Sequence, residues 1–226
     1  WVEEEIKKAK TLTDRPFGIN LMLMAPNVEE IAELALREKV AFVTTGAGSP
    51  LPWIERMHQG GVKGIPVVPN VKLAKRIASS GADALIIEGM EAGGHIGTMT
   101  TMALLSNVLR ESYPIPVLAA GGISDGRALA AALLMGADGV QMGTRFLLTT
   151  ECPVHEKTKE MILNATDTDC VVTGYSRNMG VRCLANDFTR QYLEAEISGA
   201  PKETLLAMGT GRSRKGMKEG DIVNGS

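Results

Sequence analysis

The alternation of short apolar runs with helical patterns is the feature that most constrains the fold of this chain. From Phe17 to Met142, apolar or β-branched runs bounded by Gly and Pro alternate with amphipathic stretches of about ten residues or more. This rhythm is typical of βαβ units, in which parallel strands form a sheet and the connecting helices cover it. We therefore predict an α/β fold. The predicted strands are Phe17–Met24, Ala41–Thr44, Gly64–Val68, Ala84–Glu88, Pro116–Ala119 and Gly139–Met142.

The number of predicted strands bears on how the sheet is closed. A (β/α)8 TIM barrel needs eight strands to close its ring, and six are visible here. For a TIM barrel we therefore expect the first two strands and the C-terminal end to lie outside this chain. The opening WVEEEIKKAK, which resembles the middle of a helix, agrees with that expectation. An open doubly wound sheet accommodates six strands and remains an alternative.

The rhythm weakens after Phe146, and the rest of the chain is predicted to be organised differently. Stretches containing Thr, Asn and Asp interrupt helical pieces near Glu156–Leu163 and Arg190–Glu196, and the end is rich in Gly and charge. We therefore predict a barrel core in residues 1–150 and an irregular, partly helical cap and extension in residues 151–226.

Composition excludes several classes of function. The chain carries 24 Lys and Arg against 26 Asp and Glu, for a net charge of −2, with both signs interspersed. We therefore expect neither a nucleic acid nor a membrane surface as partner, and no apolar run approaches the length of a spanning helix. The three Cys and three His are scattered, which predicts no disulfide framework and no metal site. Cytoplasmic localisation is the resulting expectation.

One glycine-rich loop carries the sharpest catalytic candidate. The sequence EGMEAGGHIG follows the strand that ends at Glu88, and loops at the carboxyl ends of parallel strands form the active face of a barrel. Glycines allow a ligand to approach the backbone closely, and an imidazole can transfer protons near neutral pH. His95 is therefore the candidate catalytic residue. A tight turn with His95 as an ordinary surface side chain is the alternative.

Two later loops are predicted to bind a phosphate. Gly121-Gly122 follows one predicted strand and Gly143-Thr144 follows the next, and loops at this place in a barrel commonly bind phosphate through backbone N–H groups. FMN, which has one terminal phosphate, fits such a site. Neither a GxGxxG fingerprint nor a Walker loop is present. Glycines that only serve turns are the alternative.

Two amide side chains lie inside predicted strands. Asn20 belongs to the first visible strand and Gln141 to the last, where a barrel interior is normally branched and apolar. Each alone could be a buried polar residue satisfied by backbone groups. A planar cofactor over the barrel mouth would account for both.

Four motifs in order resemble a known family. RPFGINLML, EGMEAGGHIG, IPVLAAGGISDG and ADGVQMGTRF resemble enoyl-acyl carrier protein reductase II of bacterial fatty-acid synthesis, which is FMN-dependent and shares its barrel with the nitronate monooxygenases. The resemblance implies that NADH, or NADPH, reduces the flavin, which then reduces the trans-2 double bond of an enoyl thioester on acyl carrier protein. It also implies a homodimer, and leaves open a monovalent cation.

The same resemblance implies roles for individual residues. His95, in the GGH motif, corresponds to the family's catalytic histidine. The implied FMN contacts are Asn20, Glu88, Gly94, Gly121, Gly122, Gln141, Gly143 and Thr144. The family's GGMAW-like flavin loop is not in this sequence, so the implied site is incomplete.

Two other functions remain open. A nitronate monooxygenase, which oxidises nitronates with oxygen, is similar in the GGH loop and the GT turn, although EGMEAGGHIG and MGTRF resemble the reductase more. A barrel that only binds a phosphate-bearing ligand is a further alternative, because fold does not determine function.

Overall fold

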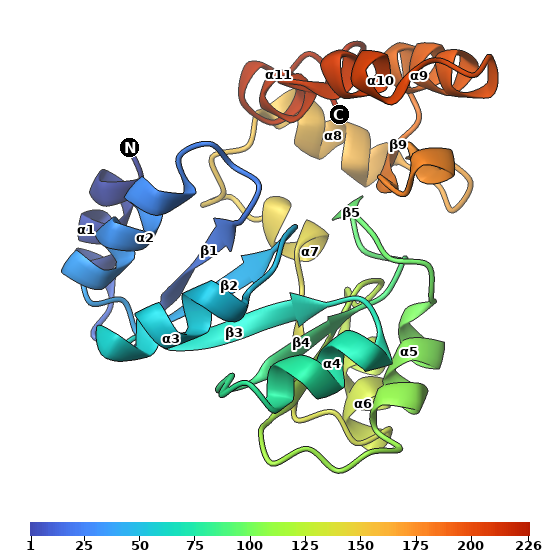
Figure 1. Cartoon of the computed structure of the whole chain (residues 1–226). Helices are drawn as coiled ribbons and strands as arrows, with labels where there is room; N and C mark the ends of the chain where they lie inside the picture. Colours follow the sequence, from blue (N-terminus) through green and yellow to red (C-terminus); the bar gives the residue numbers. More distant parts are fainter. The chain divides into compact units, whose positions relative to one another are not determined.

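The computed structural model describes residues 1–226 and contains a six-stranded sheet that is wholly parallel. Its strand order is β1-β2-β3-β4-β6-β7, and Figure 1 shows the neighbouring strands β1 to β4 of this sheet. The strands are β1 (Gly18–Met22), β2 (Phe42–Gly46), β3 (Lys63–Val68), β4 (Leu85–Glu88), β6 (Val117–Ala120) and β7 (Gly139–Gln141). All six predicted strands are confirmed, and the parallel strands form a half-barrel.

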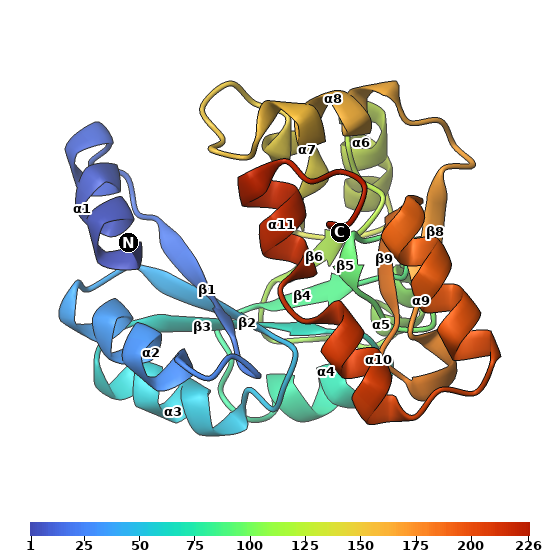
Figure 2. The same ribbon diagram turned by 90° about the horizontal axis from the view of Figure 1, so that it is seen from above.

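The helices between these strands also lie where the pattern places them. They are α2 (Val28–Arg37), α3 (Leu51–Gln59), α4 (Val71–Ala78), α5 (Thr101–Val108) and α6 (Gly126–Leu134), and α1 (Val2–Leu12) precedes β1. Figure 2 shows α2, α3 and α4 side by side along one face of the sheet. Asn27 occupies the N-cap of α2 but makes no capping hydrogen bond, because its backbone (φ −104°, ψ 19°) is not extended as a capping residue requires.

The chain forms two compact units that are discontinuous in sequence. The first comprises Trp1–Glu88, Thr101–Ala120 and Leu129–Gln141, and the second comprises Gly89–Thr100, Gly121–Ala128 and Met142–Ser226. The first unit holds the parallel sheet, whereas the second combines the loops that follow β4 and β6 with everything beyond β7. The predicted division into residues 1–150 and 151–226 stays a prediction.

The core of the first unit lies between the sheet and its helices. Leu21 of β1 and Val43 of β2 are buried against Ala32 and Ala35 of α2 and Met57 of α3. Successive side chains of a strand point to opposite faces, so the neighbours of these residues point to the face that the helices do not cover. The burial of one face therefore decides which residues are available to a ligand on the other.

The second unit contains a small antiparallel sheet and five helices. The sheet has the order β5-β9-β8. Its strands are β5 (Gly94–His95), β8 (Cys170–Thr173) and β9 (Val181–Leu184), and its helices are α7 (Thr144–Leu147), α8 (Glu156–Asn164), α9 (Asp187–Ile197), α10 (Lys202–Gly209) and α11 (Arg212–Glu219). Phe188, Tyr192 and Leu205 form a small buried cluster.

The predicted irregularity of this region is only partly correct. The helices near 156–163 and 190–196 are confirmed, but β8, β9, α10 and α11 are regular elements that the sequence pattern did not reveal. The glycine- and charge-rich end contains α11, and the amide of Asn186 donates hydrogen bonds to the carbonyl oxygens of Ile222 and Gly225. Contacts between distant residues, which no local pattern records, stabilise these elements.

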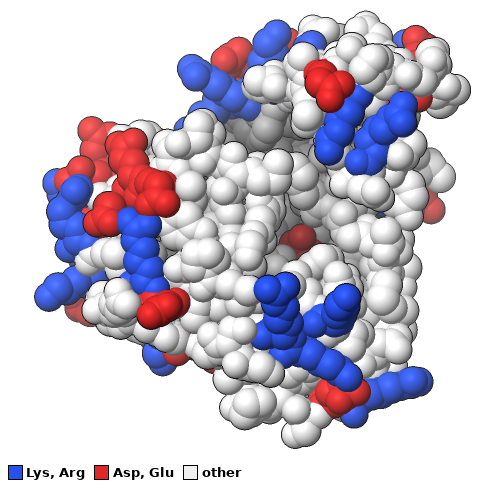
Figure 3. All heavy atoms as spheres, viewed as in Figure 1, with Lys and Arg blue, Asp and Glu red and all other residues white.

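Charges of both signs lie side by side on the first unit. Glu3 pairs with Lys7 and Arg37, and Lys10 pairs with Glu38, over α1 and α2, where Figure 3 shows acidic and basic side chains together. The described helices include none that is long and apolar enough to cross a membrane.

Candidate functional site

Three of the predicted site residues share one face of the parallel sheet. Glu88 of β4 lies opposite Ala120 of β6, and Ala120 lies opposite Gln141 of β7, so the side chains of Glu88 and Gln141 point to the same face. Following the register through β2 and β3 places Asn20 on that face as well. It is the face opposite to the one that the helices bury, so these polar groups are not enclosed by the helical layer.

Glu88 is the residue on this face whose pKa is shifted by its surroundings. It is partly buried, and its carboxyl group makes no hydrogen bond or ion pair within the chain. Burial raises the pKa of this carboxyl from 4.5 to about 7. Near neutral pH, a large fraction of Glu88 is therefore a neutral acid that can donate a hydrogen bond to an acceptor on a ligand.

The two amides differ in how far the protein satisfies them. The hydroxyl of Thr44 donates a hydrogen bond of 2.9 Å to Oδ1 of Asn20, which leaves the Asn20 amide nitrogen available as a donor. Gln141, the last residue of β7, makes no hydrogen bond through its side chain. Together with Glu88 they present donors and acceptors along the free face of one sheet.

The glycine loops are brought together in the second unit. A Cβ atom built on Gly93 would lie 3.7 Å from the hydroxyl of Thr144, and one built on Gly122 would lie 3.0 Å from Cβ of Glu91. The loops 89–100 and 121–128 and the start of α7 are therefore neighbours. The predicted pairing of Gly121-Gly122 with Gly143-Thr144 at one phosphate stays a prediction.

Backbone geometry explains two of these glycines. Gly94 has φ +89° and Gly122 has φ +72°, which side-chain-bearing residues rarely adopt. No atom lies within 4 Å of a Cβ built on Gly94 or on Gly143, so space is open beside both backbones. Within the second unit, open space beside the glycine N–H groups suits a phosphate. Within the first unit, the partly buried, unpaired Glu88 suits a polar ring. In these respects the residues present fit FMN.

The side chain of His95 is exposed and makes no hydrogen bond or ion pair within the chain. His95 is the second residue of β5, where it lies opposite Val181 of β9 in antiparallel register. An exposed imidazole without an internal hydrogen bond can meet a substrate. The other histidines are engaged elsewhere: His58 lies 2.8 Å from Asp83, and His155 caps α8.

The hairpin of β8 and β9 is the part of the site that sequence reasoning missed. Its strand β9 pairs with β5 and so determines where His95 lies. The available signal was the pair of apolar runs CVVT and VRCL around a turn containing Gly, Ser and Asn. The pairing of β9 with the two-residue strand β5, far away in the sequence, has no corresponding sequence pattern.

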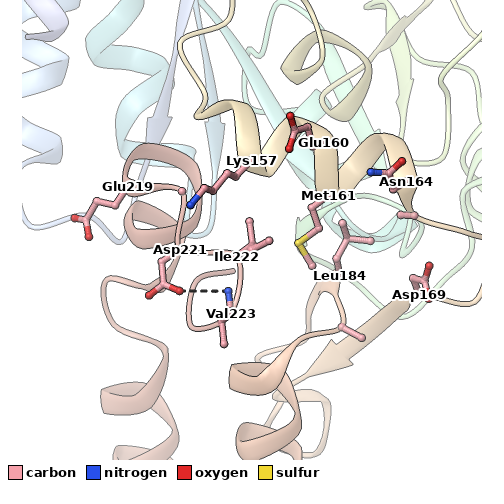
Figure 4. Close-up of a pocket in the computed structure, with 13 residues that line it drawn as sticks. Lys157, Glu160, Met161, Asn164, Asp169, Leu184, Glu219, Asp221, Ile222 and Val223 are labelled. Carbon is pink, nitrogen blue, oxygen red and sulfur yellow. Dashed lines mark hydrogen bonds between the residues drawn. The ribbon is translucent and has the colours of Figure 1, made fainter.

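A separate hollow in the second unit holds none of the predicted residues. Its volume is about 880 Å3, and α8, the end of β9 and the segment after α11 line it (Figure 4). Met161, Leu184 and Ile222 form apolar walls, while Lys157 and Asp221 contribute opposite charges. The chain contains no cluster of three or more His, Cys, Asp or Glu that could hold a metal ion.

Comparison with known proteins places the chain in a family. Residues 31–225 match the nitronate monooxygenase family. The chain belongs to this family. Among curated proteins, it is 43% identical over 186 residues to an octahydro-indene-carboxyl-CoA dehydrogenase of Rhodococcus jostii, covering 82% of this chain and 52% of that protein. It is 30% identical to a probable nitronate monooxygenase of Staphylococcus haemolyticus, covering 91% of this chain and 71% of that protein.

Solved structures of similar fold include one strong match. FabK from Thermotoga maritima matches all of this chain and 71% of its own, at 43% identity and a TM-score of 0.93. A nitroalkane oxidase from Streptomyces ansochromogenes matches 98% of this chain and 76% of its own, at 27% identity and a TM-score of 0.79. The predicted TIM-barrel fold class is thereby confirmed. The chain spans about half the length of the first curated relative.

Proposed function

We propose that this protein is an FMN-dependent enoyl-acyl carrier protein reductase that uses NADH or NADPH. The observation that carries the proposal is the match to FabK, an enoyl-acyl carrier protein reductase II, over the whole of this chain at 43% identity. The exposed His95, in a glycine-rich loop that neighbours the 121–128 loop and the start of α7, supports it. The proposed substrate is a trans-2 enoyl thioester of acyl carrier protein, and the product is the saturated acyl thioester.

The names of other relatives agree with a thioester substrate. The Rhodococcus jostii relative, also 43% identical, is a dehydrogenase named for a carboxyl-CoA compound. Coenzyme A esters and acyl carrier protein esters share the same thioester chemistry. The nitronate monooxygenase and FabK families are FMN-dependent flavoproteins, which supports FMN as the cofactor.

Each proposed binding residue then has a physical task. Backbone N–H groups around Gly121, Gly122, Gly143 and Thr144 bind the phosphate, because glycine lets an anion approach the backbone. Asn20, Glu88 and Gln141 supply hydrogen bonds to the polar edge of the flavin ring, and Gly94 leaves room beside it. Bound FMN would supply hydride transfer from the nicotinamide to the β-carbon of the enoyl thioester.

His95 has the task of moving a proton. Its imidazolium donates a hydrogen bond to the thioester carbonyl oxygen, or a proton to the α-carbon, as negative charge develops there. The exposed imidazole has no internal partner that would have to be displaced first. NADPH use, a monovalent cation, a homodimer and cytoplasmic localisation belong to the same proposal and rest on the resemblance.

Nitronate oxidation is the second candidate function. The family match and the nitroalkane oxidase structure at 27% identity favour it. A histidine beside a flavin can also serve as base for a nitronate's parent nitroalkane, so the site chemistry alone does not separate the two. The higher identity to FabK makes the reductase the first candidate.

One experiment separates the two functions. The whole protein, purified with its flavin, is mixed with NADH and a short enoyl thioester, and NADH absorbance is followed; a parallel sample receives ethyl nitronate under air without NADH. Thioester-dependent NADH loss supports the reductase. Nitronate consumption without NADH, and no response to the thioester, would overturn it in favour of the monooxygenase.

A further inference from the structure

A single carboxylate on α9 holds the turn that joins β8 to β9. Oε2 of Glu196 accepts a hydrogen bond of 2.7 Å from the backbone N–H of Gly174. Oε1 accepts bonds of 2.8 Å and 2.6 Å from the backbone N–H and the hydroxyl of Ser176. Three donors thus converge on one side chain, whereas the neighbouring Glu194 on the same helix is exposed and its carboxyl makes no hydrogen bond or ion pair.

The turn stabilises the ionised form of Glu196. Burial opposes ionisation, but the hydrogen bonds from Ser176 and Gly174, together with the charge of Arg177, lower the pKa of this carboxyl. Hydrogen bonds to a charged acceptor are stronger than those between neutral groups. The turn is further fixed by Arg177, whose guanidinium donates to the carbonyl oxygen of Ala200.

The turn leads directly to β9, the strand that pairs with the His95-bearing strand β5. Gly180, at the end of the turn, accepts a hydrogen bond of 3.0 Å from the N–H of Ile96. The next residue, Val181, lies opposite His95 in the register of β5 with β9. A Cβ atom on Gly180 would lie 3.2 Å from the side chain of Ile96, so this side chain packs closely over Gly180. A short chain of contacts therefore runs from Glu196 to His95.

We propose that Glu196 is a positioning residue for His95, acting through the β8–β9 turn and the pairing of β9 with β5. The inference rests on the proposed function, in which His95 serves the thioester step. A strand of two residues cannot fix its own direction, so β5 depends on its partner. Small displacements of a catalytic group cost large factors in rate, because proton transfer requires close approach.

The first test compares Glu196→Gln with Glu194→Gln in the whole flavin-loaded protein. Glutamine keeps the shape but removes one acceptor oxygen and the charge. We expect roughly a tenfold fall in kcat with the enoyl thioester, unchanged KM for NADH and unchanged flavin content, while Glu194→Gln stays within about twofold of wild type. Ser176→Ala, which removes one of the three donors and leaves Glu196 intact, is expected to give a smaller fall of the same kind.

A double-variant cycle shows whether the effect passes through His95. In a His95→Ala background, Glu196→Gln should change kcat by less than about twofold, because the group that it positions is gone. An equal fold-loss in both backgrounds would overturn the proposal, since Glu196 would then act on stability or on another group.

Hydrogen exchange separates this inference from the proposed function. Exchange of the Ile96 amide, which donates to Gly180, should be about tenfold faster in Glu196→Gln than in wild type and unchanged in Glu194→Gln. This readout requires no enoyl reductase activity. Faster exchange in a protein that lacks reductase activity would contradict the function but retain the positioning; unchanged exchange would overturn the positioning whatever the activity.

Discussion

The polar residues of the parallel sheet and the loop that carries His95 reach their positions in different ways. Glu88 and Gln141 lie on strands of one regular sheet, where strand period and register decide their common face. His95 lies on β5, a strand of two residues. Its one partner strand is β9, the second strand of a hairpin far away in the sequence. The first arrangement tolerates local change, because many hydrogen bonds maintain the sheet. The second depends on a few contacts, so single substitutions should affect it more.

Of the predictions that test this comparison, removal of His95 should give the largest loss of activity. We expect His95→Ala to lower kcat with an enoyl thioester by about 100-fold or more, since general acid catalysis contributes on the order of 100- to 10,000-fold. Flavin content should be unchanged. His58→Ala, which removes an exposed histidine paired with Asp83, is the control and should cost less than about twofold. Near-normal turnover by His95→Ala would contradict a catalytic role for His95.

Substitution of Gly122 tests whether the glycine loops need their backbone geometry. Gly122→Ala places a Cβ at φ +72° and about 3.0 Å from Glu91, which must shift the loop. We expect flavin affinity, measured by titration of the flavin-free protein, to weaken on the order of tenfold. Gly61→Ala is the matched control, because Gly61 has φ +74° with no atom nearby and follows α3 in the other unit. Equal flavin affinity in both variants would show that this loop does not touch the flavin.

One helix cap from each unit allows a comparison of how much a capping residue contributes to stability. Asn186 caps α9 and also donates to two carbonyl oxygens near the C-terminal end, whereas Asn70 caps α4 through one bond to the N–H of Leu73. We expect Asn186→Ala to lower the free energy of unfolding by about 2 kcal/mol and Asn70→Ala by about 1 kcal/mol. Urea unfolding of both variants measures the difference. Equal losses would mean that the extra bonds of Asn186 add nothing.

The smallest expected effect concerns Glu88 and pH. Because burial raises the pKa of its carboxyl from 4.5 to about 7, the folded flavin-free protein binds this proton more tightly than the unfolded chain does. Stability from this residue is therefore present below about pH 4.5 and is lost as pH rises to about 7. Glu88→Gln removes the penalty. We expect its melting temperature to exceed that of wild type on the order of 2–4 °C at pH 8 and to match it near pH 4; Glu194→Gln, at an exposed site, should show no such crossover.

The sequence determined the regular part of this protein. Apolar runs alternating with amphipathic stretches predicted all six parallel strands and their helices, because strand and helix periods are local properties that burial on one face enforces. The same strand assignments placed Asn20 and Gln141 within strands, and loop positions after strands drew attention to His95 and the glycine pairs. The assignment of these residues to FMN stays a prediction.

Tertiary structure decided what depends on distant partners. Three features each join segments far apart in sequence: the pairing of β5 with β9, the turn held by Glu196, and the hydrogen bonds from Asn186 to the C-terminal end. The raised pKa of Glu88 likewise follows from burial, which no pattern in EGMEAGGHIG reveals. Local propensity is read from neighbours along the chain, whereas desolvation and cross-strand pairing arise only when remote segments pack together.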